Sequence, residues 1–275
     1  MQDLPKNIWT YWHQGFEDAP LVVKSCVAQI QKLHPDWTIH LLNRDNIGDF
    51  IDPIPIQKDK WEKLLLPHRS DLIRTQLLIK YGGVWIDPTC FPVQSLSVWL
   101  AEYMTADVFF FAHPGRARVI SNWFIAAQKG NYLLKKLYTE LCEYWHYDFT
   151  NLRGPASQLE KLTMRAINRS PNATRLWFTP LFTKLIRWSP YMIYHYKFYD
   201  LSCSDKKCQE IWDAMPKFPA QKPHQLQQYG LLDSADETIK AKIDTKDSPL
   251  FKLTWKLPQG EIPKDSVLHY LMASN

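Results

Sequence analysis

Short apolar runs alternate with amphipathic stretches through the first half of the chain. Strands are predicted where apolar or alternating residues stand between turn-forming residues; they cover 7–12, 37–42, 84–87 and 108–112, with a further one at 123–127. Helices are predicted where apolar residues recur at helical spacing; they cover 20–34, 70–81 and 131–147. Pro53 and Pro55 break the stretch 43–66 into short helices.

This alternation predicts an α/β layer structure with a mostly parallel central sheet up to about residue 130. From about residue 156 the pattern becomes mainly helical and then irregular. No internal repeat or low-complexity linker divides the chain. We therefore expect a single domain over 1–275, with an α/β part at 1–130 and a C-terminal elaboration at 131–275.

Composition narrows the class of ligand. The 33 basic and 28 acidic residues leave a net charge of +5, which suits anionic small molecules but forms no dense basic stripe for nucleic acid. The aromatic share is 14%, with 12 Trp, and such rings either fill a core or stack on sugars and nucleobases. Five irregularly spaced cysteines, no signal peptide and no long apolar window predict a cytoplasmic protein.

The segment 68–91, HRSDLIRTQLLIKYGGVWIDPTCF, carries the densest chemistry. Asp71 and Arg74 lie three residues apart and therefore on one face of a helix. Gly82 and Gly83 end that helix, and Asp87 follows the next buried strand. Ligands of open α/β sheets bind beyond the carboxyl ends of strands, so this segment predicts a site with two carboxylates and a guanidinium.

The pattern SDxxRxxxLxxxGGxWxD in this segment resembles the core of glycosyltransferases related to capsular polysaccharide synthesis proteins. These are kin to the family 32 sugar transferases and, more distantly, to the clostridial glucosylating toxins. KNIWTYWHQG (6–15), ISNWFIAAQKGN (120–131) and SPLFKLTWK (248–256) resemble further family segments in the same order. The resemblance implies a GT-A-like, Rossmann-type domain and a retaining transferase that uses a nucleotide sugar, UDP by analogy, with Mn²⁺ or Mg²⁺.

The resemblance also implies a metal site. Asp87 corresponds to the first Asp of the family's DxD motif, near the ribose, the metal and the sugar. Thr89 stands where the second carboxylate would be, and a neutral hydroxyl is a weak ligand, which puts tight metal binding in doubt. His269, in what reads as an apolar strand, is a candidate C-terminal ligand. The alternatives are a turn-capping Asp87 and a hydrogen-bonded core histidine.

By the same resemblance Asp71 and Arg74 contact the donor sugar. Asp71 accepts hydrogen bonds from sugar hydroxyls, and Arg74 donates to sugar or phosphate oxygens with its planar fork. Gly82 and Gly83 are expected to lie at the donor as the backbone turn of the site. The alternative is an ordinary helix ion pair, with Ser70 as the helix N-cap.

Aromatic and turn residues complete the expected pocket. Trp9, Tyr11 and Trp12 are each expected either to stack on the donor base or to pack in the core. Asn122 and Trp123 resemble a family segment near the sugar and the acceptor, which implies a donor role for Asn122 and an acceptor-side role for Trp123, although a buried Trp explains this segment without function. The Gly154-Pro155 turn resembles a family turn where the chain enters the acceptor side, although an ordinary turn explains it without function.

The expected function is transfer of a sugar to a glycan or lipid-linked acceptor in capsule or lipopolysaccharide synthesis. The aromatic and basic stretch 181–199 suits a peripheral contact at the inner face of the membrane, or else a core with snorkelling cations. The metal and Arg74 are expected to neutralise the leaving diphosphate while the acceptor attacks from the same face. The rivals are a nucleotide-sugar hydrolase and a non-catalytic carbohydrate-binding protein.

Overall fold

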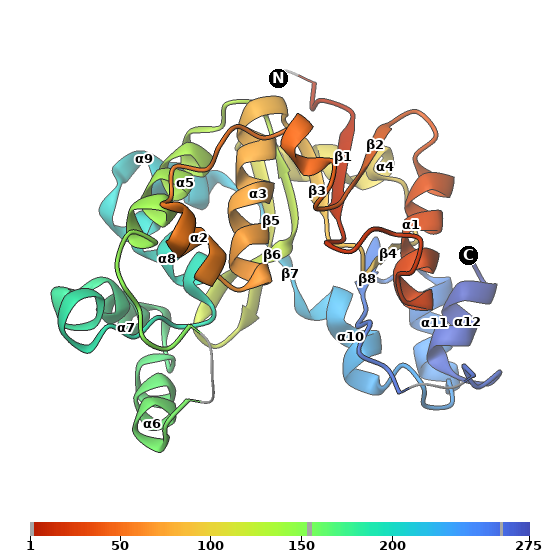
Figure 1. The fold of residues 1–275 in the computed structure, drawn as a ribbon. Helices are drawn as coiled ribbons and strands as arrows, with labels where there is room; N and C mark the ends of the chain where they lie inside the picture. Colours follow the sequence, from red (N-terminus) through yellow and green to blue (C-terminus); the bar gives the residue numbers. More distant parts are fainter. Residues whose placement is uncertain (1–2, 153–155, 259–260) are drawn as a thin grey trace.

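A six-stranded sheet in the order β2-β1-β3-β6-β5-β7 forms the centre of the protein (Figure 1). The computed structural model describes residues 3–152, 156–258 and 261–275. The sheet consists of β1 (Asn7–Tyr11), β2 (Thr38–Leu42), β3 (Gly83–Ile86), β5 (Val108–Gly115), β6 (Arg118–Ala127) and β7 (Phe218–Pro219). Strand β1 runs parallel to β2 and β3, and β5 parallel to β7, whereas β6 is antiparallel to both neighbours. The predicted α/β fold with a mostly parallel sheet is confirmed.

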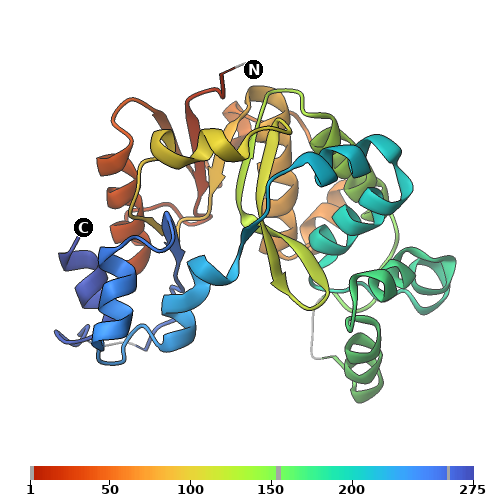
Figure 2. The same ribbon diagram turned by 180° about the vertical axis from the view of Figure 1, so that it is seen from behind.

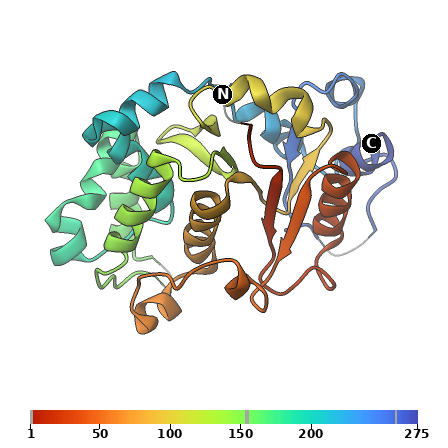
Figure 3. The ribbon, with the colours of Figure 1, turned by 90° about the horizontal axis from the view of Figure 1, so that it is seen from above.

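Successive residues of a strand point to opposite faces of the sheet, and each face packs against different helices. Trp9 and Trp85 point into one apolar cluster, and their neighbours Ile8 and Val84 point into the opposite one. The first cluster is closed by α3 (Leu66–Tyr81), α5 (Tyr132–Tyr144), α8 (Ile193–Ser204) and α9 (Lys206–Ala214). The second is closed by α1 (Leu21–Leu33), α4 (Leu96–Trp99) and η2 (Leu100–Tyr103); Figure 3 shows both helical layers from above.

Helix α3 begins earlier than the sequence suggested. Pro67 lies in its first turn, where a proline costs no hydrogen bond, so Ser70 lies inside the helix and is not its N-cap. The helix ends at Gly82, which has φ +71° and donates its N–H to the Leu78 carbonyl. Gly83 follows with φ +97°, and a Cβ there would meet the Asn7 carbonyl oxygen at 2.4 Å. Both glycines therefore serve the turn into β3.

The C-terminal residues return to α1, across the sheet from α5 and α8 (Figure 2). Strand β8 (Leu250–Lys252) pairs with β4 (Cys90–Pro92), and α10 (Gln221–Tyr229), α11 (Glu237–Asp244) and α12 (Val267–Ala273) surround this pair. The segment around His269, expected as a strand, is helix α12, in which Val267, Leu268 and Leu271 face the core. The helical and irregular character predicted for the C-terminal part is confirmed.

Short helices fill the remaining connections. They are η1 (Ile47–Asp49), α2 (Lys58–Lys63), α6 (Gln158–Ile167), α7 (Pro171–Thr174), η3 (Arg175–Phe178) and η4 (Leu181–Ile186). Helix α6 projects from the body of the protein (Figures 1 and 2). Within the described residues, no helix combines the length and the apolar character that a membrane crossing requires.

Candidate active site

A cavity of about 780 Å³ opens beyond the carboxyl ends of β1 and β3. Its walls come from several separate parts of the chain. They include Tyr11 and Trp12 at the end of β1, Asp71 and Arg74 on α3, Asp87 and Thr89 after β3, Asn122 and Trp123 on β6, and Lys252 to Trp255 at β8. The volume lies in the range of small-molecule sites, and the place is the one that open α/β sheets use for ligands.

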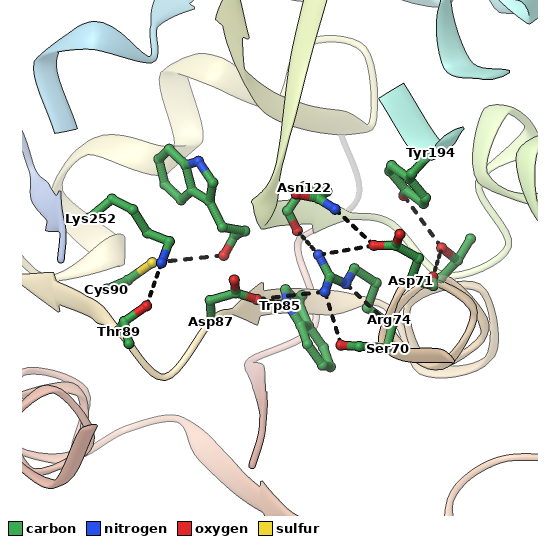
Figure 4. A network of polar contacts seen from close by, with 12 residues as sticks. Ser70, Asp71, Arg74, Trp85, Asp87, Thr89, Cys90, Asn122, Tyr194 and Lys252 are labelled. Carbon is green, nitrogen blue, oxygen red and sulfur yellow. Dashed lines mark hydrogen bonds and ion pairs between the residues drawn. The ribbon is translucent and has the colours of Figure 1, made fainter. Parts of the chain in front are cut away.

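Arg74 is the centre of a buried polar network at the floor of this cavity (Figure 4). Its Nη1 lies 3.4 Å from Asp71 Oδ1 and donates to the Asn122 carbonyl. Its Nη2 donates to Ser70 Oγ at 2.9 Å and lies 3.8 Å from Asp87 Oδ1, while Nε donates to the Ser70 carbonyl at 3.2 Å. Protein acceptors therefore surround the whole guanidinium, and Arg74 holds the two carboxylates in place.

Asp71 lies deep in the network. Burial raises its pKa to about 6, against the opposing effects of the Arg74 charge and of a 2.8 Å hydrogen bond from Asn122 Nδ2, and the Asp87 charge raises it further. Desolvation of the carboxylate thus outweighs its ion pair. At neutral pH the carboxylate form prevails, and it can accept hydrogen bonds from a bound ligand.

Asp87 is more open to the cavity, with 26% of its side chain exposed. Its Oδ1 accepts a 2.8 Å hydrogen bond from Trp85 Nε1 and faces Arg74. Its backbone N–H donates to the Trp123 carbonyl at 2.8 Å, which continues the β3–β6 ladder past the strand end. The predicted meeting of Asp71, Arg74 and Asp87 at one site is therefore what the structure shows.

Of the predicted metal ligands, Asp87 and Thr89 line the cavity and His269 does not. Thr89 is buried and its hydroxyl accepts a hydrogen bond from the Lys252 ammonium. His269 is exposed on α12 and does not line the cavity; Ser266 Oγ caps its backbone N–H at 3.2 Å. Among the described residues, no group of three His, Cys, Asp or Glu side chains could hold a metal ion. The expectation that His269 joins Asp87 is therefore wrong, whereas Thr89 does lie at the cavity.

Three predicted donor residues lie elsewhere. Trp9 is buried in the core, where it stacks on His40 at 3.9 Å and donates from Nε1 to the Gly82 carbonyl at 3.0 Å. Gly82 and Gly83 stand at the opposite end of β3 from Asp87 and are absent from the cavity walls formed by the described residues. For Trp9 the core-packing alternative therefore holds, and the expectation that Gly82 and Gly83 lie at the donor is wrong, because both serve a tight turn.

The remaining aromatic predictions are at the cavity. The Tyr11 hydroxyl lies 2.7 Å from His13 Nδ1, and Trp12 meets Trp255 edge to face with ring centroids 5.6 Å apart. Trp123 lines the wall but is itself buried against Phe111, with ring centroids 4.8 Å apart. Gly154 and Pro155 lie outside the described residues.

The structure adds cavity residues that the sequence did not single out. Lys252, Trp255, Arg118, His195 and His224 all line the walls. Burial lowers the pKa of His195 to about 3, with Arg118 and Arg74 adding to the effect, so this imidazole is neutral. Lys252 lies in the family-like segment 248–256, but its contact with Thr89, 163 residues away, arises from the β4–β8 pairing and not from a local pattern.

Comparison with known proteins adds a family and several relatives. A family model described as "Capsular polysaccharide synthesis protein" matches residues 1–151. The chain is 30% identical over 168 residues to "O-glycosyltransferase braB" of Annulohypoxylon truncatum, covering 54% of this chain and 39% of that protein. It is 28% identical over 187 residues to "O-glycosyltransferase PaGT" of Phomopsis amygdali, covering 58% and 42%. The chain thus spans about two fifths of the length of these relatives.

A solved structure titled "PaToxG Glycosyltransferase" aligns with a TM-score of 0.42 and 13% identity, over 77% of this chain and 85% of that chain.

Proposed function

The chain belongs to the capsular polysaccharide synthesis protein family, and we propose that it is a glycosyltransferase with a nucleotide-sugar donor, built as a single domain. The observation that carries the proposal is the meeting of Asp71, Arg74 and Asp87 at a cavity beyond the carboxyl ends of β1 and β3. The names of the fungal relatives support the same reaction class. UDP is the proposed nucleotide, and a surface glycan or lipid-linked sugar the proposed acceptor.

Each residue of the network has a distinct task in this proposal. The Asp71 carboxylate accepts hydrogen bonds from donor sugar hydroxyls, and Asp87, which is more exposed, lies nearer the ribose and the sugar. Arg74 orients both carboxylates and offsets their mutual repulsion. Trp12 and Trp255 offer aromatic faces to a base or a sugar ring.

The proposed reaction retains the anomeric configuration. The bond between the anomeric carbon and the diphosphate oxygen breaks, and its electron pair stays on the diphosphate. The acceptor oxygen forms the new bond on the same face, and its proton passes to the departing phosphate oxygen. Asp71 and Asp87 are both paired with Arg74, so neither carboxylate is proposed to form a covalent bond to the sugar.

Family kinship implies Mn²⁺ or Mg²⁺, but the donor set at this site fits a divalent cation poorly. Asp87 is the one predicted ligand that presents a carboxylate to the cavity, and the Thr89 hydroxyl faces the Lys252 ammonium. Hard divalent cations need several oxygen ligands, and a lysine ammonium beside the site repels them. No step of the proposed reaction is therefore routed through a metal.

Donor and acceptor assays test the proposal. Sugars linked to UDP, GDP, CDP or ADP would be incubated with the wild type and with the Asp87→Asn variant. Each incubation would be run with and without a mixture of glycan acceptors. Acceptor-dependent release of one nucleoside diphosphate is expected, and it should be lost in the variant. Equal release without acceptor would favour a hydrolase, and glycan binding without nucleotide binding would favour a non-catalytic carbohydrate-binding protein.

We further propose that the acceptor is met at a membrane surface. Within 181–199, Tyr194 and Tyr196 are buried in α8, whereas Tyr191 is 55% exposed. Exposed leucines add to this surface: Leu159 and Leu162 on α6 are 67% and 60% exposed, and Leu185 is 76% exposed beside the exposed Lys184 and Arg187. Leucines flanked by cations suit an anionic lipid surface.

Vesicle flotation tests this surface. The wild type is expected to float with vesicles of phosphatidylcholine and phosphatidylglycerol, and a Lys184→Glu/Arg187→Glu variant to remain in the soluble fraction. Each cation near such a surface contributes about 1 kcal/mol. Equal flotation of the two proteins, or equal binding of the wild type to purely zwitterionic vesicles, would contradict the electrostatic part.

A further inference from the structure

The Lys252 ammonium is hydrogen-bonded to Thr89, the residue that stands where the family pattern leads one to expect a metal-binding carboxylate. Thr89 is two residues beyond Asp87, and its hydroxyl accepts a hydrogen bond from Lys252 Nζ. Lys252 also donates to the Leu253 carbonyl at 3.2 Å. An ammonium has three N–H groups, so these two contacts orient the head group and leave one N–H for a ligand in the cavity.

The arrangement of charges shows which cation a ligand can reach. The Arg74 donors are directed at Ser70, Asp71, Asn122 and Asp87, and Arg74 is buried. In Figure 4 Asp87 lies between Arg74 and Lys252, with Lys252 on the side of Thr89. Arg74 therefore serves the protein network, while Lys252 presents its charge to the cavity.

A second cation shares this part of the cavity. Arg118 lines the same cavity as Lys252, and both charges add to the effect of burial in lowering the pKa of His224. A ligand with clustered negative charge matches this pair of cations and the neutral imidazole beside them. A nucleoside diphosphate has that character, with its charge concentrated on two linked phosphates.

We propose that Lys252 performs the task of the divalent cation, so that the protein binds its donor diphosphate without metal; this inference rests on the proposed function. The ammonium donates to a diphosphate oxygen in the bound donor. When the bond to the anomeric carbon breaks and its electron pair remains on the diphosphate, the fixed positive charge of Lys252 stabilises the growing negative charge. Lys252 transfers no proton in this step, and Thr89 is the positioning residue that orients its ammonium group.

Calorimetric titration with UDP, GDP, CDP and ADP tests the inference, first on the wild type in EDTA and then in Mn²⁺. We expect one diphosphate to bind with affinities that agree within about twofold in the two buffers. Lys252→Met, which keeps the length of the side chain and removes the charge, should weaken binding about ten- to hundredfold, the cost of one charged hydrogen bond. Lys252→Arg should retain most of the affinity.

Two further variants complete the test: a matched control and a variant with a reconstructed metal site. Lys24→Met removes an exposed lysine of α1 that does not line the cavity, and it should bind as the wild type does. Thr89→Asp combined with Lys252→Met creates the second carboxylate and removes the repelling charge. This double variant should regain affinity in Mn²⁺ and remain weak in EDTA.

Failure of this inference and failure of the proposed function would give different results. Binding by the wild type that disappears in EDTA, or wild-type affinity in a folded Lys252→Met protein, would overturn the inference and leave the transferase proposal standing. No binding of any of the four diphosphates in either buffer would overturn the donor proposal itself. The EDTA comparison uses the wild type, so it decides the matter even where a variant unfolds.

Discussion

Burial and ion pairing act in opposite directions on Asp71, and unfolding experiments at several pH values can show which effect is larger. The carboxylate lies 3.4 Å from the Arg74 guanidinium, which favours ionisation, yet its side chain is only 9% exposed. Desolvation prevails and raises its pKa from 3.8 to about 6. We therefore predict that Asp71 destabilises the folded protein at neutral pH relative to acidic pH.

The sign follows from proton binding. Between pH 3.8 and about 6 the folded chain holds a proton on Asp71 that the unfolded chain has lost, so the free energy of unfolding falls as pH rises. A difference of about two in pKa corresponds to about 3 kcal/mol. The loss is complete above about pH 6 and absent below about pH 4.

Asp71→Asn is the perturbation, because an amide resembles the protonated carboxyl and does not titrate. Urea unfolding of variant and wild type from pH 4 to pH 8 gives the difference between their free energies. The difference curve is needed because His68 and His195, whose pKa values burial lowers to about 4 and about 3, contribute a slope of the opposite sign. Relative to the wild type, the variant should gain about 3 kcal/mol between pH 4 and pH 7.

A flat difference curve would refute the reasoning, because it would mean that Asp71 has the same pKa folded and unfolded. A curve of opposite sign would mean that the Arg74 charge outweighs burial. Asp59→Asn is the control: this exposed residue of α2 pairs with Lys63 at 3.6 Å. Such a surface pair is worth at most about 0.5 kcal/mol, so the control should stay within that value at every pH.

Three further predictions concern two residues of the cavity and the glycine turn that leads into β3. Asp87→Asn keeps the acceptor for Trp85 Nε1 but removes the charge, so turnover should fall about a hundredfold with little loss of stability; near-normal turnover would contradict its role. Trp12→Ala should raise the donor or acceptor KM about tenfold, the worth of one aromatic contact, in steady-state kinetics. Gly83→Ala should lower the free energy of unfolding by more than about 1 kcal/mol in urea titrations, because the Asn7 carbonyl blocks the new Cβ, while activity per folded molecule is unchanged.

Local sequence patterns were sufficient where the physical cause is local. The apolar run at 84–87 and the helical spacing over 20–34 gave β3 and α1 almost at their observed bounds, because burial of one strand or one helix face is set by neighbouring residues. Asp71 and Arg74 share a helix turn, and Asp87 follows the next strand, so their meeting also depends on short-range geometry. The start of α3 was missed because Pro67 at the first turn permits a helix before Ser70.

Strand direction and long-range pairing were not predictable from such patterns. Strand β6 is apolar on both faces, as β3 is, and nothing in its composition indicates that it runs antiparallel between β3 and β5. The stretch around His269 has an apolar content that suits a strand or a helix, and the Ser266 cap that begins α12 decides between them.

Long-range pairing, which local patterns do not predict, determines the charge at the site and therefore matters for function. The family resemblance implies that Arg74 donates to sugar or phosphate oxygens of the donor. The structure gives Arg74 four protein partners at the cavity floor, and such a guanidinium is a counter-ion to the carboxylates. A polyanionic donor still needs positive charge next to Asp87, whose own charge would repel it. Lys252 meets that need from a strand 163 residues away from Thr89, so the charge balance that makes this cavity suitable for a diphosphate arises only when β8 pairs with β4.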